Sequence, residues 1–148
     1  MPSLKTPWQV DEPIPLPEYP RPQMAREVWL NLNGWWQYAV RPAGQPQPQG
    51  FDGQIRVPYA IESEYSGVSR AFHPDEKLWY RREFDLPNLN GNRWLLHFGA
   101  VDYACEVWLN GAWVGRHQGG FLPFSFEVTD QLQSGRNTIT VAVTDPTD

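Results

Sequence analysis

Apolar and polar side chains alternate along much of this chain, with the period of two that is typical of β-strands. In one such segment Trp94, Leu96 and Phe98 fall on one face, while Leu95 and His97 fall on the other. Because successive side chains of a strand point to opposite faces, this alternation predicts strands with one buried face. The same pattern recurs at 78–86, 124–128 and 138–144.

The dipeptide Asn-Gly occurs three times between apolar runs, at 33–34, 90–91 and 110–111. Asn-Gly readily adopts the positive φ angles of two-residue hairpin turns. The segment EVWLNGAWVG at 106–115 therefore predicts a strand, a tight turn and a second strand, with Trp108 and Trp113 paired across the hairpin. Helical periodicity is missing except for a possible turn near 58–66.

About eight or nine short strands separated by turn signals predict an all-β fold, an antiparallel β-sandwich. The 148 residues supply enough apolar material for one packed core. A (β/α)₈ barrel, which takes about 250 residues, does not fit in this length.

Proline interrupts the pattern at the start of the chain, where residues 1–22 hold seven of the fifteen prolines. Proline removes a backbone donor and fixes φ, so this part is expected to be neither a helix nor a central strand. We therefore divide the chain into an extended N-terminal arm at 1–27 and a single sandwich domain at 28–148. The side chains expected to anchor the arm are Trp8, Ile14, Leu16 and Tyr19, and the Pro- and Gln-rich stretch 41–50 is expected to be a surface loop.

Charge and cysteine content exclude several classes of partner. Twelve basic and seventeen acidic residues give a net charge of −5 without any basic run, which argues against nucleic acid and anionic membranes. No apolar segment is long enough to span a bilayer, and the N-terminal residues lack the apolar region of a signal peptide. The single cysteine, Cys105, fits a reducing compartment, so a cytoplasmic protein is expected.

Three residues on the predicted strands differ in chemistry from the neighbours on their faces and need an explanation. Cys105 is interpreted as a small apolar filler. Arg82 falls on an apolar face and needs a carboxylate or carbonyl partner, inside the fold or at an interface. Trp79 shares its face with charged residues and is the expected exposed platform or contact surface. The histidines and Cys105 lack the spacing of metal ligands, so neither a metal nor another cofactor is expected.

The segment HFGAVDYACEVWLNGAWVGRHQGGFLPFSFEVTD at 97–130 carries the elements VDY, VWLNG, H-x-GG-F and PF in a distinctive order. With the segments at 21–40, 78–87 and 135–145, it resembles the N-terminal domain of family 2 glycoside hydrolases, which include β-galactosidases, β-glucuronidases and β-mannosidases. The resemblance implies a jelly-roll sandwich of the galactose-binding-like type, called the sugar-binding domain. In the family this domain precedes an immunoglobulin-like sandwich and a catalytic barrel.

The resemblance also implies that this chain does not cleave bonds by itself. Retaining glycoside hydrolysis needs two carboxyl groups about 5–5.5 Å apart, and in the family both are glutamates of the barrel. Two near pairs of acidic residues in the part expected to fold, Glu62/Glu64 and Asp75/Glu76, lie in polar sequence typical of a solvated surface. The domain is therefore expected to be non-catalytic within a parent hydrolase that acts on O-glycosyl compounds.

Three residues are candidate substrate contacts, and the resemblance implies two of them, Asp102 and Asp148. Asp102 matches a family position that reaches substrate hydroxyls beside the barrel, although an Asx turn would equally explain it. Asp148 matches an aspartate that in β-galactosidase-like members contacts a substrate hydroxyl and helps to hold a monovalent cation. His117, before two glycines, is either a ligand-facing group or a structural residue.

Two other functions remain open at this stage. An autonomous carbohydrate-binding module would have the same sandwich fold and would bind sugar through a surface Trp. A structural or oligomerising sandwich would use the proline-rich arm to reach a neighbouring subunit of a homo-oligomer. In the favoured interpretation the partners are carbohydrate, bound weakly or only in the full enzyme, and the downstream domains of the parent chain.

Overall fold

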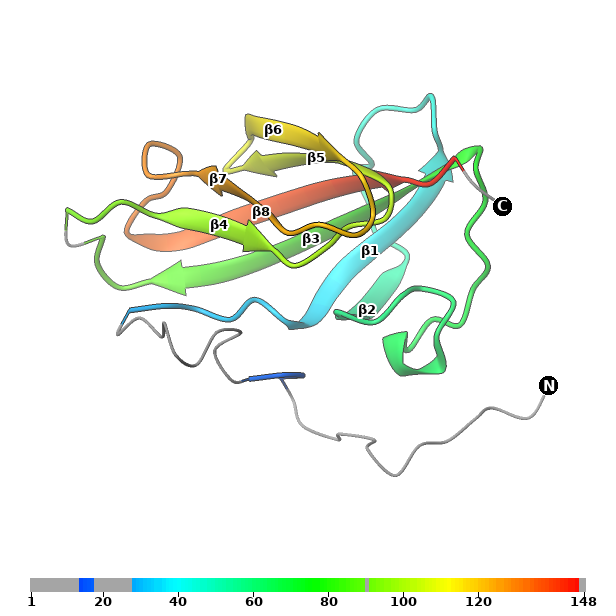
Figure 1. The fold of residues 1–148 in the computed structure, drawn as a ribbon, viewed down its shortest axis with the longest axis horizontal. Helices are drawn as coiled ribbons and strands as arrows, with labels where there is room; N and C mark the ends of the chain where they lie inside the picture. The colour runs from blue at the N-terminus through cyan, green and yellow to red at the C-terminus, as the bar shows by residue number, and fades with distance from the viewer. Residues whose placement is uncertain (1–13, 18–27, 90, 147–148) are drawn as a thin grey trace. The chain divides into compact units, whose positions relative to one another are not determined.

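The computed structural model describes residues 14–17, 28–89 and 91–146, and its regular structure is almost entirely β-strand (Figure 1). One short 3₁₀ helix, η2, covers Glu64–Ser66. The described residues hold no helix that is both long and apolar enough to cross a membrane. The strands are β1 (Gly34–Pro42), β2 (Gly53–Val57), β3 (Glu76–Leu86), β4 (Leu95–Phe98), β5 (Ala104–Leu109), β6 (Ala112–Gln118), β7 (Phe124–Glu127) and β8 (Gly135–Thr144).

The chain folds as two compact units. The first contains the described residues within Met1–Trp36 and Gln54–Ala71, and the second contains Gln37–Gly53 and the described residues within Phe72–Asp148. In the second unit β1, β3, β8, β5 and β6 follow one another in the larger sheet, and β4 pairs with β7 in a smaller one. The pairs between these neighbours are antiparallel, which confirms the predicted antiparallel β-sandwich.

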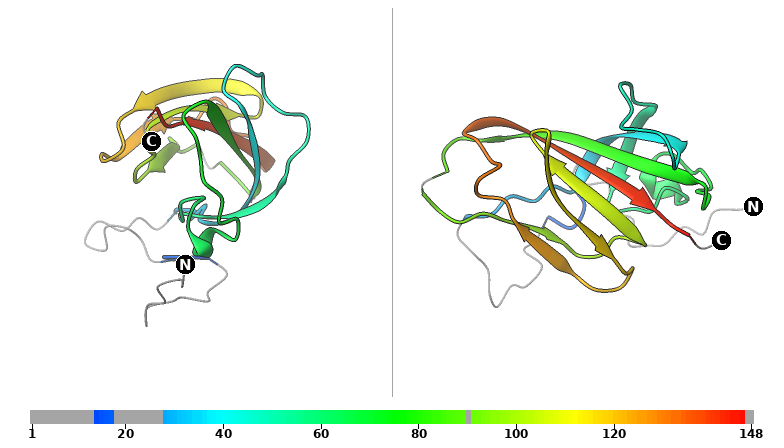
Figure 2. Two further views of the ribbon diagram at one scale, coloured as in Figure 1. Left: turned by 90° about the vertical axis from the view of Figure 1, so that its right-hand side faces the viewer. Right: turned by 90° about the horizontal axis from the view of Figure 1, so that it is seen from above.

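The smaller sheet covers one face of the larger sheet, which we call the inner face (Figures 1 and 2). On this face the register sets Tyr80 beside Val141 and Val141 beside Val107, which in turn lies beside Gly115 on β6. A Cβ atom on Gly115 would lie 2.6 Å from the Phe126 ring, so only glycine permits this approach of the two sheets.

Aromatic rings fill the space between the sheets. The Phe98 and Phe124 rings stack with centroids 4.9 Å apart, and Phe126 meets Phe124 edge-on at 5.7 Å. Beneath them, Val107, Leu109 and Ile139 of the larger sheet are fully buried. The apolar face predicted for each strand is thus the face that meets the other sheet.

The opposite, outer face of the larger sheet is also buried over part of its area. Trp79, with only 3% of its surface exposed, forms a small cluster with Ala39 and Ala142, against which Phe51 and Trp108 pack. The prediction of an exposed Trp79 platform is therefore wrong. The alternation placed Trp79 on the correct face, but it gave no sign that Phe51, at the end of the loop after β1, would cover that face.

Only one of the three Asn-Gly dipeptides makes a hairpin. Asn110 and Gly111 join β5 to β6 with φ angles of 52° and 81°, and Trp108 pairs with Trp113, as predicted. Gly34 instead begins β1, and no strand lies in 28–33. Gly91 falls between β3 and β4, which belong to different sheets, and Asn90 is outside the described residues. Local turn preference does not specify which strands pair.

The first unit has its own small core, built around Trp36, Ile55 and Ile61. The Trp36 indole N–H donates to the carbonyl of Leu32 at 2.7 Å. The buried Ser66 hydroxyl in η2 donates to the carbonyl of Ser63 at 2.7 Å, which closes the turn expected near 58–66.

A short piece of the arm, residues 14–17, is described. Its Pro15 is buried, and the carbonyls of Pro15 and Leu16 accept hydrogen bonds from the side chains of Asn33 and Asn31. Ile14 and Leu16 are exposed, so they are not the anchors that the sequence suggested. The other two predicted anchors, Trp8 and Tyr19, lie outside the described residues, and the domain division at 27/28 stays a prediction.

The two unusual strand residues of the second unit face inward. Cys105 is buried, and burial, which penalises the thiolate, raises its pKa to about 11, so its interpretation as an apolar filler is confirmed. Arg82 is paired in register with the buried Ile139, and burial lowers the pKa of its guanidinium.

Gly115→Ala should destabilise the protein by about 1–3 kcal/mol, because the new methyl group collides with the Phe126 ring between the sheets. Thermal and urea unfolding measure the loss. Gly44→Ala is the matched control, since a Cβ there meets nothing within 4 Å and stability should hardly change. Equal stability of both variants would contradict the close sheet contact.

Cys105 should resist thiol reagents in the folded protein at pH 8 and react once the protein is unfolded in denaturant. Because its pKa rises from 9.0 to about 11 on folding, the unfolded chain loses the thiol proton first as pH increases. The stabilisation that comes from the protonated Cys105 thiol is therefore complete below pH 9. It declines as the pH rises from 9.0 to about 11. Cys105→Ala should remove this decline, and rapid labelling of the native protein would contradict the burial.

Candidate functional site

Two loops of the second unit lie against each other at one end of the strands. The first, residues 99–103, connects β4 to β5, and the second, residues 119–123, connects β6 to β7. The backbone N–H of Gly119 donates to the carbonyl of Tyr103 at 2.9 Å, and the N–H of Tyr103 donates to the carbonyl of Thr144 on β8 at 3.2 Å. Backbone hydrogen bonds thus hold these two loops, which we call the loop pair.

Asp102 projects from the first loop of the pair and is exposed. Its carboxylate touches the backbone of the second loop, because a Cβ built on Gly120 would lie 2.7 Å from Asp102 Oδ1. Gly119, with a φ of +116°, adopts a conformation that favours glycine. The two consecutive glycines are therefore explained by one strained backbone position and one close approach to a carboxylate.

His117 lies on the inner face of β6, two residues before the loop pair. Its ring stacks on Phe124 with centroids 3.9 Å apart and an interplanar angle of 9°. The side chain is half-buried, and its Nδ1 is buried without a hydrogen-bond partner in the described part of the chain. His117 is thus built into the aromatic core between the sheets, while its predicted substrate contact stays a prediction.

The other predicted residue, Asp148, lies outside the described residues. The structure therefore sets Asp102 against Gly120 and places His117 among aromatic rings, without addressing Asp148. The substrate contacts of Asp102 and Asp148 stay predictions.

The loop pair also carries apolar side chains that nothing described here covers. Phe121 is 96% exposed and Leu122 is 70% exposed, and Tyr103 is partly exposed beside them. Contiguous exposed apolar residues of this size mark surfaces that contact another body. Polar Asp102 and these apolar residues together make the loop pair a candidate interface.

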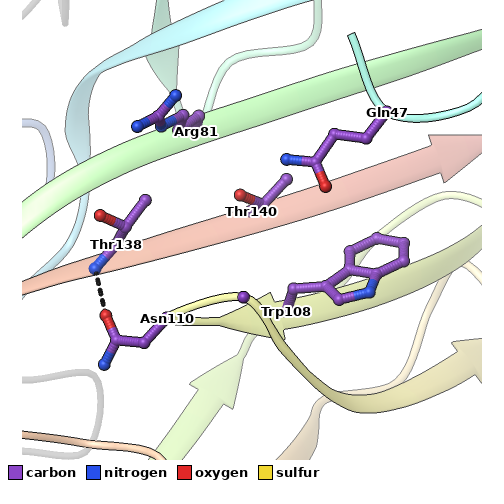
Figure 3. A pocket seen from close by; sticks show the side chains of 7 residues that line it. Gln47, Arg81, Trp108, Asn110, Thr138 and Thr140 are labelled. Atoms are coloured by element: carbon purple, nitrogen blue, oxygen red, sulfur yellow. Dashed lines mark hydrogen bonds between the residues drawn. The ribbon is translucent and has the colours of Figure 1, made fainter. Parts of the chain in front are cut away.

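A second candidate lies on the outer face of the larger sheet, where a hollow of about 300 Å³ opens between β3, β8 and β5 (Figure 3). We call it the outer-face hollow. Sequence reasoning missed it, because only the register shows that Arg81, Thr140 and Trp108 are direct neighbours across three strands. The residues that line it are Gln47, Arg81, Trp108, Asn110, Gly111, Thr138 and Thr140.

The acidic and histidine side chains of the described residues lie apart from one another. Among the described residues, no group of three or more His, Cys, Asp or Glu side chains is placed to hold a metal ion. Glu62 and Glu64, one of the near pairs in the sequence, are both exposed and belong to the first unit. Glu127 forms an exposed ion pair with Arg93, and the hydrogen bond from Arg93 is the main cause that lowers the pKa of Glu127. This carboxylate is therefore part of a surface ion pair.

The antiparallel pairing and the two facing sheets define a β-sandwich domain. A family model described as the glycosyl hydrolase 2 galactose-binding domain-like family matches residues 52–148. The chain therefore belongs to glycoside hydrolase family 2, which confirms the resemblance and the galactose-binding-like fold class.

Curated relatives carry the names of whole glycosidases. The β-glucuronidase of Felis catus is 32% identical over 138 residues, which cover 79% of this chain and 20% of that protein. A β-glucuronidase of Formosa agariphila is 37% identical, covering 74% of this chain and 12% of the relative. The β-galactosidase of Thermoanaerobacter pseudethanolicus is 29% identical, and the match covers 81% of this chain and 17% of that protein. The chain thus spans about a fifth or less of the length of these relatives.

Solved structures agree with this assignment. The Bifidobacterium dentium β-glucuronidase complexed with coumarin-3-O-glucuronide matches with a TM-score of 0.63 and 35% identity, over 76% of this chain and 19% of that one. The Faecalibacterium prausnitzii β-glucuronidase matches with a TM-score of 0.65 and 32% identity. This match covers 86% of this chain and 22% of that one. Both likenesses cover most of the present chain.

Proposed function

We propose that this chain is the non-catalytic N-terminal domain of a family 2 glycoside hydrolase, and that its loop pair borders the active site of the catalytic domain. The observation that carries the proposal is the loop pair itself. It presents an exposed carboxylate, Asp102, next to the exposed apolar residues Phe121 and Leu122. An interdomain contact would bury the apolar residues and bring the carboxylate to the edge of a substrate site.

The chemistry assigned to Asp102 is recognition of substrate hydroxyl groups. An ionised carboxylate only accepts hydrogen bonds, and a sugar presents several hydroxyl donors. The missing side chain of Gly120 leaves room for this carboxylate, since a Cβ there would lie 2.7 Å from Asp102 Oδ1. Asp102 therefore orients the sugar, while the two carboxyl groups of a retaining hydrolysis, about 5–5.5 Å apart, belong to the catalytic domain.

A β-glucuronide is the favoured substrate of the parent enzyme. The β-glucuronidases of Felis catus and Formosa agariphila and two solved β-glucuronidases support this choice. The β-galactosidase relative makes a β-galactoside the second candidate. The parent would hydrolyse the O-glycosidic bond, and this chain would contribute to binding at its edge.

Three further features stay predictions from the sequence. They are the cytoplasmic location, the association into a homo-oligomer and the use of the proline-rich arm in that association. Removing residues 1–20 and measuring the mass in solution tests the role of the arm, because an unchanged number of subunits leaves the arm without that role.

The parent enzyme should hydrolyse an aryl β-glucuronide faster than the matching β-galactoside, and the 148-residue chain alone should hydrolyse neither. Asp102→Asn in the parent should lower kcat/KM by about ten- to hundredfold, because a charged acceptor of a substrate hydroxyl is lost. The exposed Asp130→Asn is the matched control and should leave kcat/KM unchanged.

Gly120→Ala separates the position of the carboxylate from its charge. The new methyl group pushes Asp102 aside, so activity should fall, whereas the flexible side chain lets stability stay near that of the wild type. Gly99→Ala, where a Cβ meets nothing within 4 Å, is the control. Full activity of both Asp102→Asn and Gly120→Ala would overturn the proposed border role, and hydrolysis by the isolated chain would overturn its non-catalytic assignment.

A further inference from the structure

We propose that the outer-face hollow binds a pyranose sugar, at a site separate from the loop pair. The hollow lies at the Asn110–Gly111 end of β5, whereas Asp102 precedes the other end of that strand. Six strand residues separate the two places, which corresponds to about 20 Å at the usual rise per residue. The inference does not depend on the proposed function.

Trp108 supplies the apolar wall of the hollow. Its indole is only partly buried, and one side packs against Trp79 with ring centroids 5.6 Å apart and an interplanar angle of 29°. Trp79 is itself buried in the outer-face cluster, so the Trp108 ring is fixed before any ligand arrives. A fixed indole is a suitable platform for the C–H face of a sugar ring, which is apolar although the ring edge is polar.

Thr140 supplies a polar group on the floor of the hollow. The residue is only 5% exposed, and it lines the hollow from β8. A hydroxyl group can both donate and accept a hydrogen bond, so Thr140 suits a ligand that carries hydroxyl groups. The register places Thr140 directly between Arg81 and Trp108, so a sugar over Trp108 would bring a hydroxyl to it.

Two longer polar side chains complete the lining. Arg81 has a buried Nε without a partner in the described part of the chain, and its nearest ion-pair carboxylate, Glu83, is 3.9 Å away. Gln47 comes from the loop after β1, and Figure 3 shows its amide extending toward Thr140. Arg81 offers donors, and Gln47 offers both a donor and an acceptor, which matches the mixed hydrogen bonding of sugar hydroxyls.

The Asn110 turn forms a rigid end to the hollow. The Asn110 amide donates to the Gln131 carbonyl and to Asn137 Oδ1, both at 2.8 Å. Its oxygen accepts from the backbone N–H of Thr138 at 2.9 Å (Figure 3). These bonds occupy the side chain, so Asn110 shapes the site while Thr140, Gln47 and Arg81 remain for a ligand.

The dimensions and charge of the hollow favour one sugar ring over other small ligands. Its volume of about 300 Å³ is at the lower end for small-molecule sites. A nucleotide phosphate would need several cations or a glycine-rich loop, and Arg81 is the only cation in the lining. A neutral sugar and a sugar acid share the ring and hydroxyl chemistry, and they differ in whether Arg81 meets a carboxylate.

The test measures binding of methyl β-glucuronide and methyl β-glucoside to the protein by nuclear magnetic resonance of its indole N–H groups. We expect millimolar affinity for at least one sugar, with the largest shift at the Trp108 indole. Thr140→Val and Gln47→Ala should each weaken binding about five- to tenfold, as the loss of one hydrogen bond predicts. Tighter binding of the glucuronide assigns Arg81 to the carboxylate, and equal binding assigns it to hydroxyl oxygens.

Thr144→Val is the matched control, because Thr144 lies on the same strand outside the hollow and its loss should leave binding unchanged. Thermal melting confirms that each variant folds. Asp102→Asn should also leave this binding unchanged, which keeps the result distinct from any failure of the proposed function. Binding of neither sugar at tens of millimolar, binding unaffected by Thr140→Val, or binding abolished by Asp102→Asn would each overturn the inference.

Discussion

The second unit depends on the close packing of its two sheets at Gly115. The Phe126 ring of the smaller sheet occupies the volume where a side chain at position 115 would lie. This contact lets the Phe98, Phe124 and Phe126 rings fill the interior. The chain then leaves β7 and returns to the larger sheet as β8. Burying this aromatic surface is the main favourable term available to a domain that is almost entirely strand.

The same packing positions the loop pair. The loop pair lies where the strands of the two sheets connect, so the backbone bond from Gly119 to Tyr103 and the contact of Asp102 with Gly120 follow from the arrangement of the sheets. His117 shows how core and site share one strand, because its ring stacks on Phe124 only two residues before the loop. The outer-face hollow lies on the opposite face of the larger sheet, where the Trp108 ring packs against Trp79.

Several features of the fold could be predicted from the sequence alone. The alternation correctly assigned the faces of β3, β4 and β8, and the Asn110–Gly111 hairpin followed from turn chemistry. The motifs at 97–130 indicated the family that the comparison with residues 52–148 establishes. These predictions succeeded because strand period and turn conformation are local properties of the chain.

Tertiary structure decided the rest. Trp79 was predicted to be exposed, but it is buried on the outer face. The sequence of a strand does not show that a distant loop, here 43–52, returns to cover one of the strand's faces. The outer-face hollow requires Arg81, Thr140 and Trp108 to be neighbours, although they lie far apart in sequence, and only strand order and register bring them together. The sequence by itself determined the faces, the hairpin and the family, while long-range packing decided what those faces meet and which polar side chains gather around the outer-face hollow.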